Sequence, residues 1–248
     1  MVLILIGLNP RAIRTELRCN EFNKWKELRQ RGIGVLWYGS CTATNAWVSN
    51  KGGLSSGEWT NAIKASMNSM SNRGTGGRSV GNPHCRNLAC NENNIIETLP
   101  HIRGSCPKTE LLRNNAHHKV RTILANLFRA KNLEVHEEVC CVAVDEGAAQ
   151  NRRADIIVVD RRKGRGLILD PTIRWETNDE QQDVNVHEEK RGIYLPCTSN
   201  LSNVYGVREW EVFGLWFGAR RTASKLLLDF FKNHGLQRRD LEKISKIS

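Results

Sequence analysis

The fold is decided by residues 152–172, which read Arg-Arg-Ala-Asp-Ile-Ile-Val-Val-Asp-Arg-Arg-Lys-Gly-Arg-Gly-Leu-Ile-Leu-Asp-Pro-Thr. Two short β-rich runs, 155–160 and 167–172, flank a basic segment that supplies a turn, so the pattern predicts an antiparallel hairpin. The head of one strand then lies beside the end of the next, which brings Asp155 and Asp170 together. Their oxygens would suit a hard cation such as Mg²⁺. The alternative is that both aspartates are simply solvated polar residues at the ends of their strands.

Regular elements are expected on both sides of this hairpin. Apolar spacing predicts a helix over 111–131, and β-rich composition predicts strands at 134–144 and 209–217. Polar residues 179–190 suit a helix, and residues 222–233 form a closing helix. The expected order is therefore helix, three strands, helix, strand, helix, which defines an α/β fold.

Two further residues are candidates for chemistry beside the acids. Lys190 follows the hairpin within the polar helix and would orient a nucleophile or neutralise charge on a phosphate in the transition state. Glu176 is a candidate further acid. Basic residues around the hairpin are expected to contact phosphates, the alternative being a solvated basic face: Arg152, Arg153, Arg161, Arg162 and Lys163.

The region before residue 81 is less regular. A basic helical piece is expected around 24–28, a strand at 32–38, and a helix over 54–70 that starts at Ser55 to Glu58. A Ser, Asn, Arg and Gly-rich stretch at 69–83 predicts a flexible linker and a domain boundary. The apolar opening, residues 1–8, is too short for a membrane span and lacks the features of a signal peptide.

Three cysteines and a histidine form the clearest motif of the chain. Cys85, Cys90, His101 and Cys106 lie within 22 residues and supply the four soft ligands of a closed, structural zinc site. His84 could compete as a ligand, and the alternative is four unrelated residues in a basic loop. The pattern of all eight cysteines indicates metal binding rather than a disulfide framework, and hence a reducing, intracellular location.

The overall charge favours a polyanionic partner. The 248 residues include 37 Lys and Arg against 26 Asp and Glu, a net charge of +11. Phosphate neutralisation supplies most of the affinity in contacts with nucleic acid, which is the simplest such partner. The alternative is a merely basic protein.

Several motifs in a fixed order resemble one known family. They are the cysteine and histidine run, then 111–121, 135–139, 152–157, 169–174, and Glu189-Lys190 through Tyr194. Together these segments resemble the carboxy-terminal region of Pol proteins from non-LTR retrotransposons of the restriction-like-endonuclease class, as found in arthropod genomes. The resemblance covers roughly residues 80–235, and residues 20–80 less closely.

The resemblance implies a zinc knuckle followed by a nuclease of the PD-(D/E)xK type with an αβββαβ core. Asp155 then fills the first acidic position, Asp170 the second, and Lys190 the position of a displaced lysine. Ala154 replaces the proline of the general motif, and Pro171-Thr172 replace its lysine. The implied cofactors are structural Zn²⁺ and catalytic Mg²⁺, and the implied partners are target DNA and element RNA, in the nucleus, without a membrane.

The implied activity nicks target DNA so that a 3′-hydroxyl primes reverse transcription. The chain has no aromatic-x-Asp-Asp polymerase signature, so we expect it to start just behind the polymerase. The expected domains are a post-polymerase segment (1–80), the zinc knuckle (81–110), the nuclease (111–235) and a basic tail (236–248). The competing hypothesis is an inactive nucleic-acid-binding remnant.

Overall fold

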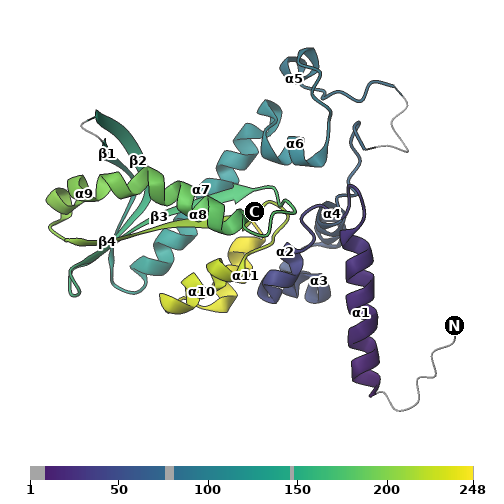
Figure 1. Ribbon diagram of the computed structural model, residues 1–248, viewed down its shortest axis with the longest axis horizontal. Coiled ribbons are helices and arrows are strands. Elements are labelled where there is room, and N and C mark those ends of the chain that lie inside the picture. Colours follow the sequence, from purple (N-terminus) through teal and green to yellow (C-terminus); the bar gives the residue numbers. More distant parts are fainter. Residues whose placement is uncertain (1–8, 76–80, 146–147, 248) are drawn as a thin grey trace.

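The computed structural model describes residues 9–75, 81–145 and 148–247 (Figure 1). The apolar residues 1–8 and part of the expected linker, residues 76–80, lie outside the described residues. Before the sheet lie α1 (Pro10–Lys26), α2 (Trp37–Ser40), α3 (Ala46–Asn50), α4 (Ser56–Ser66), α5 (Leu88–Glu92), α6 (Leu99–Gly104) and α7 (Glu110–Arg129). From the sheet onward lie β1 (Glu134–Asp145), β2 (Ala148–Asp160), β3 (Arg165–Arg174), α8 (Gln182–Tyr194), α9 (Thr198–Tyr205), β4 (Glu209–Gly218), α10 (Lys225–Asn233) and α11 (Arg238–Ser245).

A four-stranded mixed sheet organises the second half of the chain, in the order β1-β2-β3-β4. β1 pairs with β2 and β2 with β3 in antiparallel fashion, whereas β3 and β4 are parallel, because the chain crosses over through α8 and α9. The predicted hairpin is therefore confirmed, as is the predicted order of a helix, three strands, a helix and a strand. The sequence did not suggest α9.

Helices cover both faces of this sheet (Figure 1). On one face Ile156, Val158 and Leu169 pack with α7, α10 and α11. On the other face Ile157, Val159 and Ile168 pack with the segment from Tyr194 to Leu201. The alternation of apolar residues in β2 thus fills two cores, as expected for a central strand.

The alternation in β2 is interrupted at Asp155. Ala154 belongs to the same apolar cluster as Ile157, although residues three apart in a regular strand point to opposite faces. Opposite this point on β1, Glu138 has a φ of +56° and forms no pair within the ladder. The pairing of β2 with β3 also ends here, at Ile156 and Leu169. The two strands therefore separate at Asp155 and Asp170, which are the next residue on each strand beyond this last pair.

Two expectations about the flanking regions were wrong. Residues 32–36 form turns rather than a strand, because Gly34 has a φ of +69° and a Cβ there would collide with Glu176. The expected basic tail contains α11, whose Leu241 and Ile244 are fully buried in the main core. The helix expected over 54–70 is present as α4, and Ser55 and Glu58 form its capping box.

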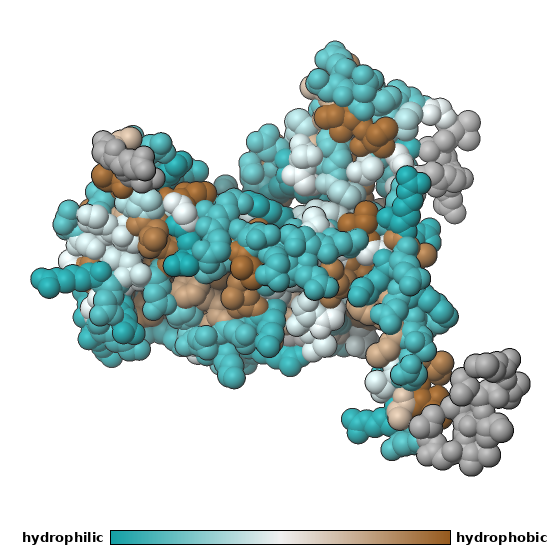
Figure 2. Space-filling model, viewed as in Figure 1, coloured by the Kyte–Doolittle hydropathy of each residue, from teal (hydrophilic) through white to brown (hydrophobic). Residues whose placement is uncertain are grey.

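The surface is mostly hydrophilic on the face shown in Figure 2. Hydrophobic surface gathers around the lobe that carries α5 and α6, where Leu88 is 72% exposed. In the described ranges, no helix is long and apolar enough to cross a membrane.

Candidate active site and metal centre

Asp155 and Asp170 line one cavity of about 740 Å³, at the point where β2 and β3 part. Asp170 is held from α8: Lys190 Nζ lies 3.2 Å from its Oδ2, and Thr172 Oγ1 donates to its Oδ1 at 3.0 Å. Asp155 is held from α7, because His117 Nε2 lies 3.1 Å from its Oδ2. Groups from both faces of the sheet therefore meet in one cavity.

Asp170 lies where burial disfavours its ionised form. Its side chain is only 5% exposed, and burial raises its pKa above the ordinary 3.8. The charge of Lys190 opposes this shift, whereas the charge of Asp155 adds to it. The two carboxylates are therefore close enough to repel each other, which a shared cation would relieve.

Close packing of a glycine positions Lys190. Gly214 of β4 stands opposite Asp170 of β3 in the parallel register. A Cβ at Gly214 would lie 2.8 Å from both Cβ and Cγ of Lys190. The stem of Lys190 thus passes directly over the bare backbone of β4, which explains a glycine in the interior of a buried strand.

His117 is the site residue that the sequence analysis missed. Its hydrogen bond to Asp155 raises its pKa above 6.5, although burial opposes this shift. The residue lies in a segment that carries the family resemblance, yet nothing in its local pattern distinguishes it from the adjacent His118. Only the packing of α7 against β2 and β3 brings it to the acids.

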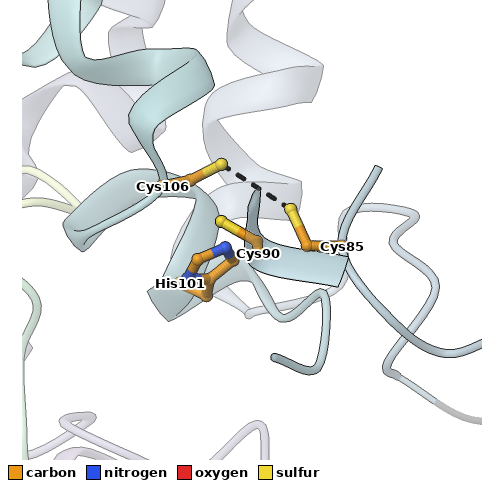
Figure 3. A group of neighbouring side chains, drawn as sticks. All are labelled: Cys85, Cys90, His101 and Cys106. Carbon is orange, nitrogen blue, oxygen red and sulfur yellow. Dashed lines mark hydrogen bonds between the residues drawn. The ribbon is translucent and has the colours of Figure 1, made fainter. Parts of the chain in front are cut away.

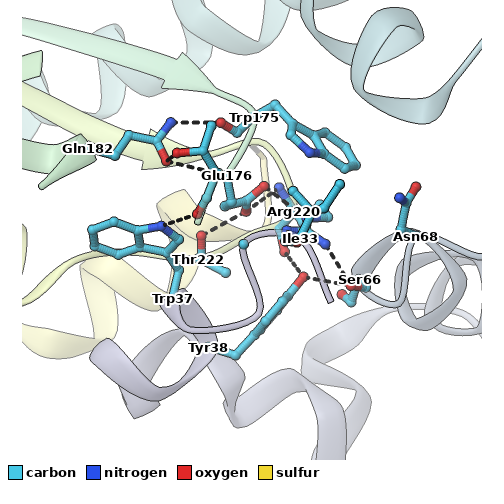
Figure 4. Close-up of polar contacts among 12 residues, drawn as sticks. Ile33, Trp37, Tyr38, Ser66, Asn68, Trp175, Glu176, Gln182, Arg220 and Thr222 are labelled. Atoms are coloured by element: carbon cyan, nitrogen blue, oxygen red, sulfur yellow. Dashed lines mark hydrogen bonds and ion pairs between the residues drawn. The ribbon is translucent and has the colours of Figure 1, made fainter. Parts of the chain in front are cut away.

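Glu176 does not belong to this cavity, and the expected role as a further acid was wrong. Glu176 is fully buried and paired with Arg220, whose backbone N–H and Nε donate to its two oxygens at 2.9 and 3.0 Å (Figure 4). Thr222 Oγ1 donates to the same carboxylate at 2.7 Å. Because these donors satisfy both oxygens of its carboxylate, Glu176 has a structural role: it holds the segment after β4 in place.

Arg220 extends this anchor to the N-terminal segment. Its guanidinium donates to the carbonyl oxygens of Ile33 and Ser66 at 2.6 and 3.2 Å (Figure 4). It also lies between the rings of Tyr38 and Trp175, 5.6 and 4.6 Å from their centroids. Residues 33–66 are thereby tied to the end of β4.

The basic residues of the hairpin divide into two groups. Arg161, Arg162 and Lys163 lie at the β2–β3 turn, six to eight residues from Asp155, and six residues of extended strand span about 20 Å. They line a separate cavity. These three residues are therefore separated from the two acids, which occupy the other end of the hairpin.

Arg152 and Arg153 lie near Asp155, on the two-stranded extension of β1 and β2. Arg153 is 68% exposed and pairs with Glu138, and Arg152 donates to Gln150 at 2.6 Å. Both lie close to the cavity in sequence, but neither is among the residues that line it.

The cysteine and histidine motif converges on one point. One ligand atom from each of Cys85, Cys90, His101 and Cys106 lies within 4.8 Å of all the others, close enough to bind a metal (Figure 3). Turns and the starts of α5 and α6 create this arrangement, with Asn87 and Thr98 capping the two helices. His84 is not part of the group.

The donor set fits zinc. His101 Nδ1 shares a hydrogen bond with Ser105, while its Nε2 is buried and has no hydrogen-bond partner among the described residues. A metal ligated by Nε2 satisfies this orphaned atom, and three thiolates with one imidazole are typical of a structural tetrahedral site. All eight cysteines are free of disulfides.

The metal centre is attached to the rest of the molecule on both sides. Arg113 of α7 donates to the carbonyl oxygen of Cys106 at 2.7 Å. Glu97, which is 4% exposed, accepts from the backbone N–H groups of Arg73 and Arg86 at 3.1 Å each. The described part of the expected flexible linker is therefore bound to the knuckle up to Gly74.

Comparison of the chain with protein-family models finds no match, and comparison with curated proteins finds none. What the fold and site define is a mixed α/β protein with a cavity that holds two aspartates and a lysine, and with a cluster able to bind a metal.

Proposed function

We propose that this chain is a metal-dependent DNA endonuclease of the restriction-like class, derived from a non-LTR retrotransposon Pol protein. The observation that carries the proposal is the meeting of Asp155, Asp170 and Lys190 in one cavity where two strands part. The metal-binding cluster ahead of α7 and the net charge of +11 agree with it.

Mg²⁺ fits the donors that the cavity offers. Asp155 and Asp170 present carboxylate oxygens, which are the preferred ligands of this cation. Their mutual repulsion, which contributes to the raised pKa of Asp170, would fall if both carboxylates held a divalent cation. When bound, Mg²⁺ supplies polarisation of the phosphodiester and a lowered pKa for the attacking water.

The side chains of the protein then orient the reactants. Lys190 brings a positive charge 3.2 Å from Asp170, where it orients the attacking water and offsets the negative charge that develops on the phosphate. His117 acts through Asp155 and is a positioning residue, since it holds that carboxylate in a fixed direction. Exposed Arg153 contacts the backbone of the DNA that reaches the cavity.

The proposed reaction hydrolyses one phosphodiester of target DNA and leaves a 3′-hydroxyl that primes reverse transcription. The partners are therefore DNA and the RNA of the element, and the site of action is the nucleus. This part of the proposal is supported by the sequence resemblance and by the order of elements from α7 to β4.

The test is the nicking of supercoiled plasmid in the presence of Mg²⁺ or Mn²⁺. We expect wild type to convert the plasmid to open circles and Asp170→Asn to do so at least about a thousandfold more slowly. Asp160→Asn is the matched control, because Asp160 lies at the other end of β2 and an asparagine keeps the oxygen that accepts from Arg162 and Lys163.

Two results would overturn the proposal. One is an intact plasmid after incubation with zinc-loaded, folded wild type. The other is equal nicking by wild type and Asp170→Asn. Salt-dependent DNA binding without cleavage would instead support the inactive nucleic-acid-binding remnant.

A further inference from the structure

A second, smaller pocket lies beside the catalytic cavity, with a volume of about 250 Å³. It is formed by three segments that are distant in sequence: α4, α6 and the turn after β4. Typical small-molecule sites measure about 300 to 1,000 Å³, so this pocket suits a single chemical group. Three arginines line it: Arg103, Arg220 and Arg221.

Two of these arginines are not held in an ion pair within the described part of the chain. Arg220 is paired with Glu176, but the side chains of Arg103 and Arg221 form no ion pair or hydrogen bond with any part of the chain that the structure describes. Arg221 lies over Trp47, 5.1 Å from the ring centroid, and its Nη1 is buried. Glu58, the acid of the rim, accepts from the backbone N–H and hydroxyl of Ser55 in its capping box.

Partial burial makes these charges costly, and it lowers the pKa of Arg103 and of Arg221. The charge of Arg220 lowers the pKa of Arg103 further, and the charge of Arg103 lowers the pKa of Arg221. The carboxylates of Glu176 and Glu58 oppose these shifts only in part, so an anion bound between the two guanidinium groups would stabilise both charges.

A neutral donor at the same pocket is also unsatisfied. The hydroxyl of Ser66, a residue that is 7% exposed, is buried and has no hydrogen-bond partner in the described ranges. Arg221 Nη1 and Ser66 Oγ are thus two orphaned groups that line one pocket. Buried polar groups nearly always find a partner, so both point to a ligand that accepts hydrogen bonds.

The pocket adjoins the catalytic cavity. Met70 and Arg103 line both, so a chain of phosphates that occupies one reaches the other. Arginine is the residue that matches the oxygens of a phosphate with two parallel hydrogen bonds. A planar fork from Arg221 and a hydroxyl from Ser66 together suit a tetrahedral anion.

We infer that Arg103, Arg221 and Ser66 bind a backbone phosphate of the DNA strand that flanks the scissile phosphodiester. This inference rests on the proposed nuclease, because it assigns the neighbouring cavity to the same strand. Binding of this phosphate would fix the position of the DNA strand, and hence how far the strand extends into the catalytic cavity. Free phosphate has the same chemistry and is the competing source of the ligand.

The experiment measures binding of a fluorescein-labelled duplex to the full zinc-loaded chain by anisotropy, without added divalent cations so that no cleavage occurs. We expect Arg221→Gln and Arg103→Gln each to weaken binding about tenfold and to reduce the salt slope by about one. Ser66→Ala should cost about tenfold and leave the slope unchanged, because a hydroxyl carries no charge.

Arg14→Gln is the matched control, because it removes one charge from the exposed α1, away from the pocket. We expect it to weaken binding less than threefold. Ser66→Ala removes a single oxygen atom and should fold as wild type does. It therefore still tests the inference if an arginine variant fails to fold. Circular-dichroism melting of every variant identifies such a failure.

Free phosphate is tested by melting the protein in phosphate against chloride of equal ionic strength. A rise in melting temperature that Arg221→Gln abolishes, with DNA affinity unchanged in that variant, would assign the pocket to free phosphate and overturn the inference. It is also overturned if folded Arg221→Gln and Ser66→Ala bind DNA as Arg14→Gln does. Because the assay measures affinity alone, a chain that fails to nick plasmid still gives an answer.

Discussion

At the scale of single residues, Asp170 shows a conflict between folding and chemistry. Its carboxylate is buried among groups that only partly compensate its charge, and burial outweighs Lys190 in setting its pKa. Such a group costs stability when it ionises in the absence of a cation. Functional sites commonly carry such a cost.

We predict that Asp170→Asn melts at a higher temperature than wild type at pH 7 without divalent cations. The folded protein holds the proton of Asp170 more tightly than the unfolded chain, since its pKa is raised above 3.8. The stability from this group is present below 3.8 and is lost as the pH rises through the native pKa. The advantage of the asparagine should therefore shrink as the pH falls towards 4.

The same melting experiment with Mg²⁺ supplies the control. At ten times its dissociation constant, a cation stabilises wild type by about 1.4 kcal/mol and leaves Asp170→Asn unchanged. Asp160→Asn should behave as wild type does. A lower melting temperature for Asp170→Asn at pH 7, or equal stabilisation of both proteins by Mg²⁺, contradicts the account.

The residues of the site differ in how far the sequence reveals them. Asp155 and Asp170 bracket a recognisable turn, so the antiparallel register alone predicts that they are neighbours. The sequence placed Lys190 on a helix that follows, but only Gly214 explains how its stem crosses β4. Glu176 and His117 could not be assigned correctly, because their partners are 44 and 38 residues away.

At the scale of elements, one buried ion pair joins the two halves of the chain. Glu176 follows β3, and Arg220 follows β4 and donates to carbonyl oxygens before α2 and at the end of α4. Both side chains are fully buried. The pair therefore determines how the N-terminal helices sit against the sheet.

We predict that Glu176→Gln destabilises the protein by about 3 to 5 kcal/mol, because it leaves the charge of Arg220 buried and uncompensated. Urea unfolding followed by tryptophan fluorescence measures this loss. At temperatures where the variant is folded, its plasmid nicking should stay within about twofold of wild type. If Glu176→Gln were as stable as wild type but did not nick plasmid, Glu176 would have a role in the reaction and this account of it would be wrong.

Elements were predicted well where periodicity dominates and poorly where tertiary contacts decide. The long helix α7 and the four strands have strong apolar patterns. The apolar run at 32–38 has the composition of a strand, but Trp37 packs against Trp216 with ring centroids 4.6 Å apart and the chain turns there. The charge of 236–248 suggested a tail, whereas Leu241 and Ile244 make α11 part of the core.

At the scale of the whole molecule, the candidate metal centre contributes to the shape of the cavity that holds Asp155 and Asp170. α6 carries the ligand His101 and also Arg103, which lines the cavity. Ile102 and Leu99 of the same helix line it as well. Zinc is therefore expected to stabilise a wall of the cavity as well as the knuckle.

We predict one zinc ion per chain, and loss of that ion in Cys106→Ser, measured by elemental analysis. Hydrogen exchange over residues 84–106 should then become fast, while β2 and β3 stay protected, because their core lies elsewhere. DNA affinity should fall as Arg103 loses its support. Cys140→Ser is the control, since Cys140 is an exposed thiol of β1 outside the cluster. Zinc binding and exchange equal to wild type in Cys106→Ser would contradict the metal centre.

The central claim is that Asp155 and Asp170 act as one unit in phosphodiester hydrolysis. The most direct test compares plasmid nicking rates for wild type, Asp155→Asn, Asp170→Asn and the double variant under saturating Mg²⁺. Residues that act together show non-additive losses, so we predict that each single variant falls at least about a thousandfold and that the double variant falls no further. Single variants that nick as wild type does, or losses that multiply in the double variant, would contradict the claim.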